Sequence, residues 1–410
     1  MTRNKILHIL FVVILILPAV ALPGTQARAG VQGTILVNTT EDELNADGDC
    51  SLREAIQAAN TDTAVDACPA GGGADIISIP AGLYSLTLGL PGEDANQGGD
   101  LDITQDLTIL GDEQAGVIID GNANDRVIHI FGSKVTIARL TIRNGYLATG
   151  TGAGIAVNST ASLVLNRVTL TGNEAASSGG ALDNTGTLQM RDVLFTNNAA
   201  SSGGALLNTG SLKITGATFA NNAASLKGGG IDNSNPATLT NVTFSGNTAQ
   251  LYGGGMFNDG NDVRLTNVTF TNNSTAIRNN GNLYLLNTIV AGSTAGSNYN
   301  CSGMIDKFYS LGHNLDSGNS CNFTHLGDLV NTDPLLGPLG DYQGPTPTHP
   351  LLEGSPAIDA GTNQNCPSTD QRGVSRPADG NNDTLKTCDM GAFEFNGVFL
   401  FFIYMPITNR

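Results

Sequence analysis

The chain has 410 residues, of which 52 are Gly, 15 are Pro and 40% are hydrophobic. Its glycines lack a collagen period, and its apolar content is too high for a disordered chain. The 19 Lys and Arg residues against 36 Asp and Glu give a net charge of −17, which argues against a nucleic-acid-binding protein because such a protein needs a basic surface. The length fits two ordinary domains or one elongated domain.

Residues 1–29 have the features of a secretory signal peptide. Arg3 and Lys5 precede an apolar run, and Ala27-Arg28-Ala29 offers a cleavage site between small residues. Pro18 interrupts the run, which favours a cleaved signal over a membrane anchor. We therefore expect an exported protein with no transmembrane span once the signal is removed.

Six cysteines follow this segment, and an even number in an exported chain favours disulfides. A zinc site is disfavoured because the cysteines lack the close spacing of zinc ligands. We predict the most local of the possible pairings, which are Cys50–Cys68, Cys301–Cys321 and Cys366–Cys388.

Residues 30–125 are expected to form an N-terminal cap and the first irregular coils of a repeat structure. Ser51-Leu52-Arg53-Glu54 has the pattern of a capping box, and Leu52, Ala55, Ile56 and Ala59 have the spacing of one helix face. We predict a short helix, pinned by Cys50–Cys68, that covers the open end of the coils described next. The alternative is that Arg53 and Glu54 belong to a functional site.

Residues 126–290 contain a repeat of about 25 residues. Each repeat has two stretches with strand-like alternation, a corner between them, a second turn and a third short strand. A unit of this size cannot bury its own apolar edge, whereas stacked units bury it in continuous columns. The pattern predicts an all-β, single-stranded, right-handed parallel β-helix with three short strands per coil and coils about 4.8 Å apart. The repeats begin at Gly154, Ala181, Ala205, Gly230, Gly255 and Ala276.

Two kinds of residue column support this prediction. Phe195, Phe219, Phe244 and Phe270 occupy the same repeat position and are expected to share one inner file. Asparagines recur at three positions, where we expect them to form tight corners and to bond neighbouring coils rather than a ligand. These columns are Asn184, Asn208, Asn233, Asn258 and Asn279; Asn173, Asn198, Asn222, Asn247 and Asn273; and Asn241, Asn267 and Asn287.

The repeat fades after residue 290, and prolines become frequent. Residues 291–395 are expected to form terminal coils with long loops, closed by two disulfides. The apolar tail within residues 396–410 is too short to span a bilayer, so it is expected to be an added edge strand or a sorting tail.

The repeats resemble those of polymorphic outer-membrane proteins, which follow the motif GGA(I/L/V) … FxxN. The motif is present as Gly179-Gly180-Ala181-Leu182 followed by Phe195-Thr196-Asn197-Asn198. Residues 50–60 resemble the CSLREA domain, and residues 355–361, 370–377 and 389–394 resemble the choice-of-anchor region of exported bacterial proteins. These resemblances imply a pectin-lyase-like fold, secreted or at the bacterial cell surface, and imply no reaction.

The function that the sequence favours is a structural or adhesive surface element that contacts glycans or other cell-envelope components, without catalysis or a cofactor. The alternative is a polysaccharide lyase or glycoside hydrolase that uses Asp183, Asp232 and Arg278, which share one outward column. The two carboxylates would be two coils, or about 9.6 Å, apart, near the upper limit of about 9.5 Å for an inverting pair. Leu207 separates them in that column.

A second alternative is a calcium-dependent binding module. Asp379, Asn381 and Asp383 alternate along the chain as in a calcium-binding loop, where successive side-chain oxygens converge on one ion. The loop lacks the glycine and the distal glutamate of an EF-hand, so a solvated acidic turn is the competing interpretation.

Overall fold

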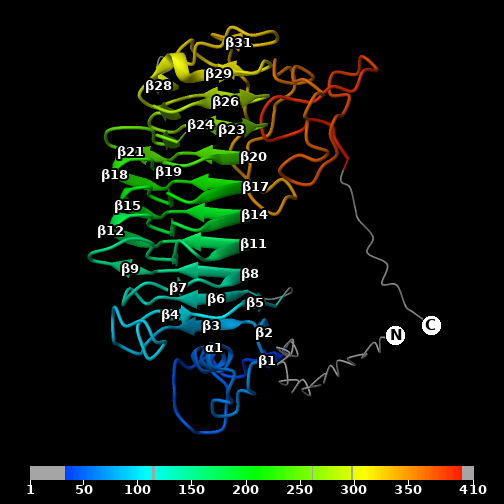
Figure 1. Cartoon of the computed structure of the whole chain (residues 1–410). Helices are drawn as coiled ribbons and strands as arrows, with labels where there is room; N and C mark the ends of the chain where they lie inside the picture. Colours follow the sequence, from blue (N-terminus) through cyan, green and yellow to red (C-terminus); the bar gives the residue numbers. More distant parts are fainter. Residues whose placement is uncertain (1–32, 113–115, 261, 297–298, 399–410) are drawn as a thin grey trace, which may run out of the picture.

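The computed structural model describes residues 33–112, 116–260, 262–296 and 299–398, which form a parallel β-helix (Figure 1). The predicted signal peptide and most of the predicted apolar tail lie outside the described residues. The strands form a seventeen-stranded sheet, a nine-stranded sheet and a five-stranded sheet, and neighbouring strands within each run parallel. The prediction of an all-β parallel β-helix is confirmed.

The elements follow in chain order within each sheet. The seventeen-stranded sheet holds β1 (Thr34–Leu36), β2 (Asp75–Ile79), β3 (Gly82–Ser85), β5 (Leu107–Gly111), β6 (Val117–Asp120), β8 (Lys134–Arg143), β11 (Ser162–Thr171), β14 (Thr187–Thr196), β17 (Ser211–Ala220), β20 (Ala237–Ser245), β23 (Val263–Thr266), β24 (Thr269–Thr271), β26 (Leu283–Leu286), β27 (Ile289–Ala291), β29 (Phe308–Ser310), β30 (Leu315–Asp316) and β31 (Leu329–Val330). The nine-stranded sheet holds β4 (Leu101–Ile103), β7 (Ile128–Ile130), β10 (Ile155–Val157), β13 (Leu182–Asn184), β16 (Leu206–Asn208), β19 (Ile231–Asn233), β22 (Met256–Asn258), β25 (Ile277–Asn279) and β28 (Cys301–Gly303). The five-stranded sheet holds β9 (Tyr146–Leu147), β12 (Glu174–Ser178), β15 (Ala199–Ser202), β18 (Ala223–Lys227) and β21 (Thr248–Ala249).

Five coils contain one long strand that bends at the predicted corner, namely β8, β11, β14, β17 and β20, whereas in the next two coils the corner separates β23 from β24 and β26 from β27. In β14 the bend is at Asp192, whose φ is 57°, and the equivalent residue of the next coil is Gly216, with a φ of 69°. The left-handed backbone at this position turns the strand, so its two halves belong to different faces of the coil. The second turn, which the sequence indicated only as a turn, also pairs from coil to coil and forms the five-stranded sheet.

The phenylalanine column is a continuous stack inside the β-helix. Ring centroids are 4.7 Å apart from Phe195 to Phe219, 4.9 Å from Phe219 to Phe244, and 4.5 Å from Phe244 to Phe270. All four side chains are fully buried. The prediction of one shared inner file is confirmed, and the spacing of the rings follows the spacing of the strands.

Two asparagine columns form hydrogen-bonded ladders, as predicted. In one of them, Asn198 Nδ2 donates to Asn222 Oδ1 at 3.0 Å, and Asn222 Nδ2 donates to Asn247 Oδ1 at 2.9 Å. In the other, Asn208 Nδ2 donates to Asn233 Oδ1 at 2.7 Å. These buried amides therefore find their partners in the coil above or below.

The third asparagine column differs from the expectation. Asn241, Asn267 and Asn287 have the positive φ angles expected of a corner, but their amides mainly contact residues after the repeats. Asn241 donates to the carbonyl oxygen of Thr369 at 2.7 Å, and Asn267 donates to that of Asp389 at 2.9 Å. This column therefore attaches the C-terminal region to the coils. Within the column, Asn287 donates to Asn267 across a long distance of 3.4 Å.

The predicted helix closes the N-terminal end of the stack. It is α1 (Leu52–Thr61), and Ser51 and Glu54 form the reciprocal hydrogen bonds of the capping box. Figure 1 places α1 below the first coils, where it contacts β2 and β4. The adjacent Cys50–Cys68 disulfide is present, as are Cys301–Cys321 and Cys366–Cys388.

The chain leaves the stack after β31, which follows the short helical turn η2 (Ile305–Lys307) and β29. Residues 331–398 fold back along the outside of the seventeen-stranded sheet (Figure 1). Thr243 Oγ1 on β20 lies 2.7 Å from Gln371 Oε1 and 2.9 Å from Thr348 Oγ1. The C-terminal region thus covers part of this sheet and leaves the nine-stranded sheet open.

Candidate functional site

The outward face of the nine-stranded sheet carries one column of polar and aromatic side chains. It contains the three residues of the enzyme alternative and extends by two coils toward the N-terminus beyond the first repeat. The residues in register are Asp102, His129, Ala156, Asp183, Leu207, Asp232, Phe257 and Arg278.

Asp183 and Asp232 each have a local partner of their own. Asp183 Oδ2 accepts a hydrogen bond from the Thr151 hydroxyl at 2.6 Å, and Asp232 Oδ2 lies 3.2 Å from Lys227 Nζ. Burial raises the pKa of both carboxyls. Leu207 lies between them in the column, so the structure does not place them in adjacent coils.

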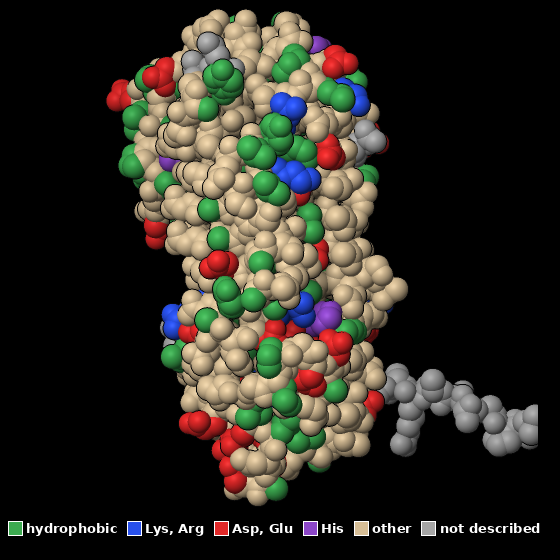
Figure 2. Space-filling model, turned by 90° about the vertical axis from the view of Figure 1, so that its left-hand side faces the viewer, with side chains coloured by type: hydrophobic (Ala, Val, Ile, Leu, Met, Phe, Trp, Pro, Cys, Tyr) green, Lys and Arg blue, Asp and Glu red, His purple; other side chains and the backbone are tan. Residues whose placement is uncertain are grey.

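Arg278 belongs to a patch of basic, aromatic and aliphatic side chains, which we call the aromatic–basic patch. The patch consists of Leu226, Lys227, Leu251, Tyr252, Phe257 and Arg278. The Arg278 guanidinium lies 4.8 Å from the centroid of the Tyr252 ring, and Lys227 Nζ lies 4.4 Å from that of Phe257. Leu251 and Tyr252 are exposed by 58% and 46%. Figure 2 shows hydrophobic and basic side chains gathered on the upper part of this face.

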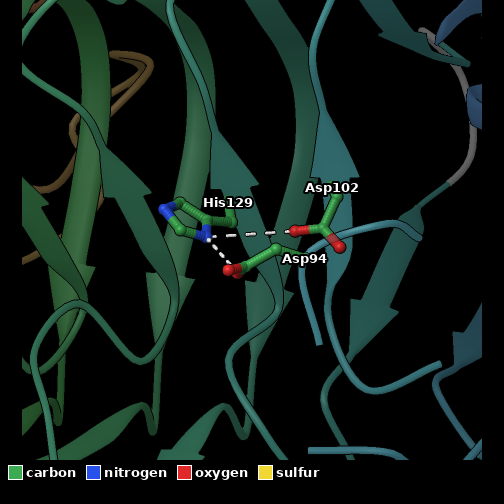
Figure 3. Close-up of side chains that lie close together, drawn as sticks. All are labelled: Asp94, Asp102 and His129. Carbon is green, nitrogen blue, oxygen red and sulfur yellow. Dashed lines mark ion pairs between the residues drawn. The ribbon is translucent and has the colours of Figure 1, made fainter. Parts of the chain in front are cut away.

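A second group lies at the other end of the column, where Asp94, Asp102 and His129 face one another (Figure 3). His129 Nδ1 is 3.5 Å from Asp94 Oδ1 and 3.9 Å from Asp102 Oδ1. On the far side of the ring, His129 Nε2 lies 3.2 Å from Asn158 Oδ1. Asp102 Oδ2 accepts from the Asn96 amide, whereas Asp102 Oδ1 has no hydrogen-bond partner among the described residues.

The fold positions these three residues by two different means. Asp102 and His129 are the central residues of β4 and β7, which pair directly, so their side chains leave the sheet on the same side. Asp94 lies on the loop between β3 and β4, and the helix α1 holds that loop. The buried Arg53 guanidinium donates to the carbonyl oxygens of Gly99 and Asp100, both at 2.9 Å.

The electrostatics of this group are dominated by burial. Burial and the neighbouring Asp100 carboxylate raise the pKa of Asp102 to about 7. Burial also raises the pKa of Asp100 to about 6, although Arg126 lies 2.9 Å from this carboxylate and opposes the shift. Burial and the positive charge of Arg126 lower the pKa of His129. The imidazole is therefore neutral near pH 7, and its two ring nitrogens have different roles.

This group was not predicted from the sequence, although the sequence contains part of the pattern that would indicate it. Leu101-Asp102-Ile103 and Ile128-His129-Ile130 each place one polar residue between two buried apolar residues. Extending the outward column below the first repeat would have aligned the two polar residues. No such pattern marks Asp94, because its loop is positioned by hydrogen bonds from Arg53, which is distant in sequence.

Asp379, Asn381 and Asp383, the predicted calcium ligands, lie on an exposed turn of the C-terminal region. Their side-chain oxygens accept hydrogen bonds from amides of the same turn. Asp379 Oδ2, for example, accepts from the Thr384 amide at 3.0 Å. Calcium binding at this turn stays a prediction.

Comparison with known proteins gives one family match. Residues 192–209 match the Chlamydia polymorphic membrane protein repeat. The matched segment includes Phe195 of the ring stack, Asn198 of a ladder and the Gly203-Gly204 pair. No curated protein gives a significant match. Among the described residues, the chain contains no helix that is long and apolar enough to cross a membrane. One coil of this β-helix is thus similar to the repeat of the Chlamydia polymorphic membrane proteins.

Proposed function

We propose that this protein is an exported adhesive scaffold of the bacterial surface, and that its aromatic–basic patch binds acidic glycans. The observation that carries the proposal is the pairing of Arg278 with Tyr252 and of Lys227 with Phe257 on the open face of a rigid β-helix. The patch offers positive charge and apolar surface in a protein whose net charge is −17.

The chemistry of the patch suits a sugar that carries a carboxylate. An aromatic ring offers an apolar face to the C–H face of a pyranose. A guanidinium binds a carboxylate through two parallel hydrogen bonds. A uronic acid polymer would satisfy both the ring and the cation.

Three further features support export to the surface. Disulfides persist in oxidising compartments, and all six cysteines of this chain are paired. The repeat match is to a membrane protein family. The resemblances of residues 50–60 to the CSLREA domain and of the C-terminal motifs to the choice-of-anchor region point the same way. On this proposal residues 1–29 are the export signal.

Binding of the purified protein to immobilised polygalacturonate and alginate, compared with neutral dextran of similar length, tests the proposal. We expect binding to the uronates only. Arg278→Gln and Tyr252→Ala should each weaken it by at least about tenfold, as expected for central anchor residues. The matched controls are Arg264→Gln and Tyr284→Ala, because Arg264 lies 4.7 Å from the Tyr284 ring on a different sheet. Equal losses in the control variants, or no uronate binding, would contradict the proposal.

The enzyme alternative rests on the raised pKa values of the Asp183 and Asp232 carboxyls, since a general acid must be protonated near its working pH. Release of reducing ends or unsaturated uronates from the same polymers distinguishes the two functions. The adhesive proposal expects none. Depolymerisation that Asp232→Asn abolishes would replace the adhesive function with a catalytic one.

A further inference from the structure

We propose that Asp94, Asp102 and His129 form a binding site for one divalent transition-metal ion of the Zn²⁺ or Mn²⁺ class. The inference is independent of the glycan proposal, because the trio lies at the opposite end of the outward column from the aromatic–basic patch. It rests on the directions in which two unpaired ligand atoms, His129 Nδ1 and Asp102 Oδ1, and the nearby Asp94 carboxylate point.

The tautomer of His129 is fixed by its neighbour. Asn158 Oδ1 is an acceptor only, so His129 Nε2 carries the proton and donates it across 3.2 Å. The other ring nitrogen, Nδ1, therefore presents a lone pair, and it has no hydrogen-bond partner among the described residues. This is the arrangement of a metal-ligating histidine, whose second nitrogen donates to an outer partner.

The lone pair faces two carboxylate oxygens instead of a hydrogen-bond donor. Asp94 Oδ1 is 3.5 Å away and Asp102 Oδ1 is 3.9 Å away. The Asp102 side chain is fully buried, and its Oδ1 also has no hydrogen-bond partner among the described residues. Three acceptors that face one another repel, and a cation between them would remove the repulsion. The buried Asp102 Oδ1 therefore lacks a partner that a bound cation would supply, which is evidence for a ligand beyond the clustering of the carboxylates.

The distances fit a small cation. Zn–N and Zn–O bonds of about 2.1 Å in a tetrahedral site place neighbouring ligand atoms about 3.4 Å apart. One ligand atom from each of the three residues lies within 4.8 Å of the other two. Small side-chain movements would close this set around an ion, and the exposed Asp94 side leaves a fourth position for water.

The donor set indicates the class of metal. One imidazole and two carboxylates suit Zn²⁺, Mn²⁺ or a neighbouring transition metal, whereas Ca²⁺ and Mg²⁺ prefer oxygen ligands alone. Arg53 prepares the site, because it binds the carbonyl oxygens of Gly99 and Asp100 at the C-terminal end of the loop that carries Asp94.

Metal content and stability test the site directly. Purified protein is stripped with a chelator, loaded with Zn²⁺, Mn²⁺, Co²⁺ or Ca²⁺, passed through a desalting column and analysed by mass spectrometry for metals. We expect about one ion per chain and a higher Tm with metal. Asp94→Ala removes an exposed ligand without disturbing the core, and His129→Gln removes the imidazole. Each should weaken binding by at least about tenfold.

Asp183→Asn is the matched control, since Asp183 belongs to the same column and also has a buried, unpaired Oδ1 but has no histidine beside it in register. It should bind metal as the parent protein does. With Co²⁺ bound, the visible spectrum should change in His129→Gln because a nitrogen ligand is lost. No retained metal in the parent protein would overturn the assignment. So would retention that Asp94→Ala and His129→Gln leave unchanged, or selective binding of Ca²⁺ in place of the transition metals.

Discussion

The Arg53 guanidinium donates to the carbonyl oxygen of Asp100 at 2.9 Å, across 47 residues of the chain. The same side chain binds the Asp42 carboxylate through Nε at 2.6 Å and through Nη2 at 3.3 Å. The Arg53 side chain is fully buried. The second residue of the capping helix therefore holds together the cap, the loop before β4 and the first coils.

Arg53→Lys should destabilise the protein by about 3–5 kcal/mol, because lysine cannot replace the forked donors and the Asp42 charge stays buried. Urea unfolding measures the loss, and limited proteolysis should cut the loop before β4 in the variant. Arg143→Lys is the control, since Arg143 pairs with Asp120 at 2.7 Å but is partly exposed. There we expect a change of at most about 1 kcal/mol. Equal losses in the two variants would contradict this role for Arg53.

Phe219→Ala should cost about 3–5 kcal/mol, because it opens a cavity in the middle of the ring stack. Phe219→Leu refills most of that volume and should cost clearly less. Chemical denaturation of both variants measures the difference. If the alanine variant lost less than about 1 kcal/mol, the stack would not be a packed core.

Gln371→Ala should loosen the C-terminal region before the β-helix unfolds. The Gln371 side chain accepts from Thr243 Oγ1 at 2.7 Å and donates to Thr218 Oγ1 at 2.8 Å, so its loss removes one hydrogen bond from each of these buried hydroxyls. Thr243 keeps its bond to Thr348 and Thr218 keeps its bond to the carbonyl oxygen of Pro347, so each lost bond should cost about 0.5–1.5 kcal/mol. Hydrogen exchange should show faster exchange in residues 345–395 and no change in β11 or β14. Gln364→Ala, at an exposed position, is the control, and equal effects of the two substitutions would contradict the prediction.

The Asp389 carboxyl should contribute less to the free energy of unfolding as the pH rises from about 4 to about 8. Burial, and then repulsion from the Glu394 carboxylate, raise the pKa of Asp389 to about 8. In the unfolded chain the group has a pKa of about 3.9, so between the two values the folded protein holds a proton that the unfolded chain releases. This group makes the free energy of unfolding decrease with pH, by at most about 1.4 kcal/mol per pH unit.

Urea unfolding at a series of pH values measures this slope. Asp389→Asn removes the titrating group, so the free energy of unfolding of the variant should decrease less steeply with pH, by up to about 1.4 kcal/mol per pH unit. A slope that the substitution leaves unchanged would show that Asp389 is ionised in the folded protein.

The sequence predicted the parts of the fold that are periodic. Phe195 and Phe219 recur at one repeat position, so stacking the coils places them together without further information. The same logic aligned Asn198 with Asn222. The docking of Gln371 on Thr243 could not be predicted in this way, because it joins segments 128 residues apart that share no period.

In the candidate sites as well, residues in the repeat register could be predicted and residues on irregular turns and loops could not. Arg278 was placed on the outward column from its repeat position, and the register confirms its place beside Phe257. Tyr252 was not predicted as a site residue because it lies before the short strand, in a turn whose length varies from coil to coil. Asp94 was not predicted because a loop brings it to His129, and that loop is shaped by Arg53 rather than by the repeat.

The hydrogen bonds between the C-terminal region and the coils also limit how such a chain can change in length. Thr218, Thr243 and Thr269 lie in three successive coils, and all three are bonded to the C-terminal region, the first two to Gln371 and the third to the Ala392 amide. Duplication of a coil between Thr218 and Thr269 would move these attachment points about 4.8 Å out of step. A coil duplicated before β17 would leave all of them in place. Growth or shortening by whole coils is therefore tolerated on the N-terminal side of Thr218 and resisted beyond it.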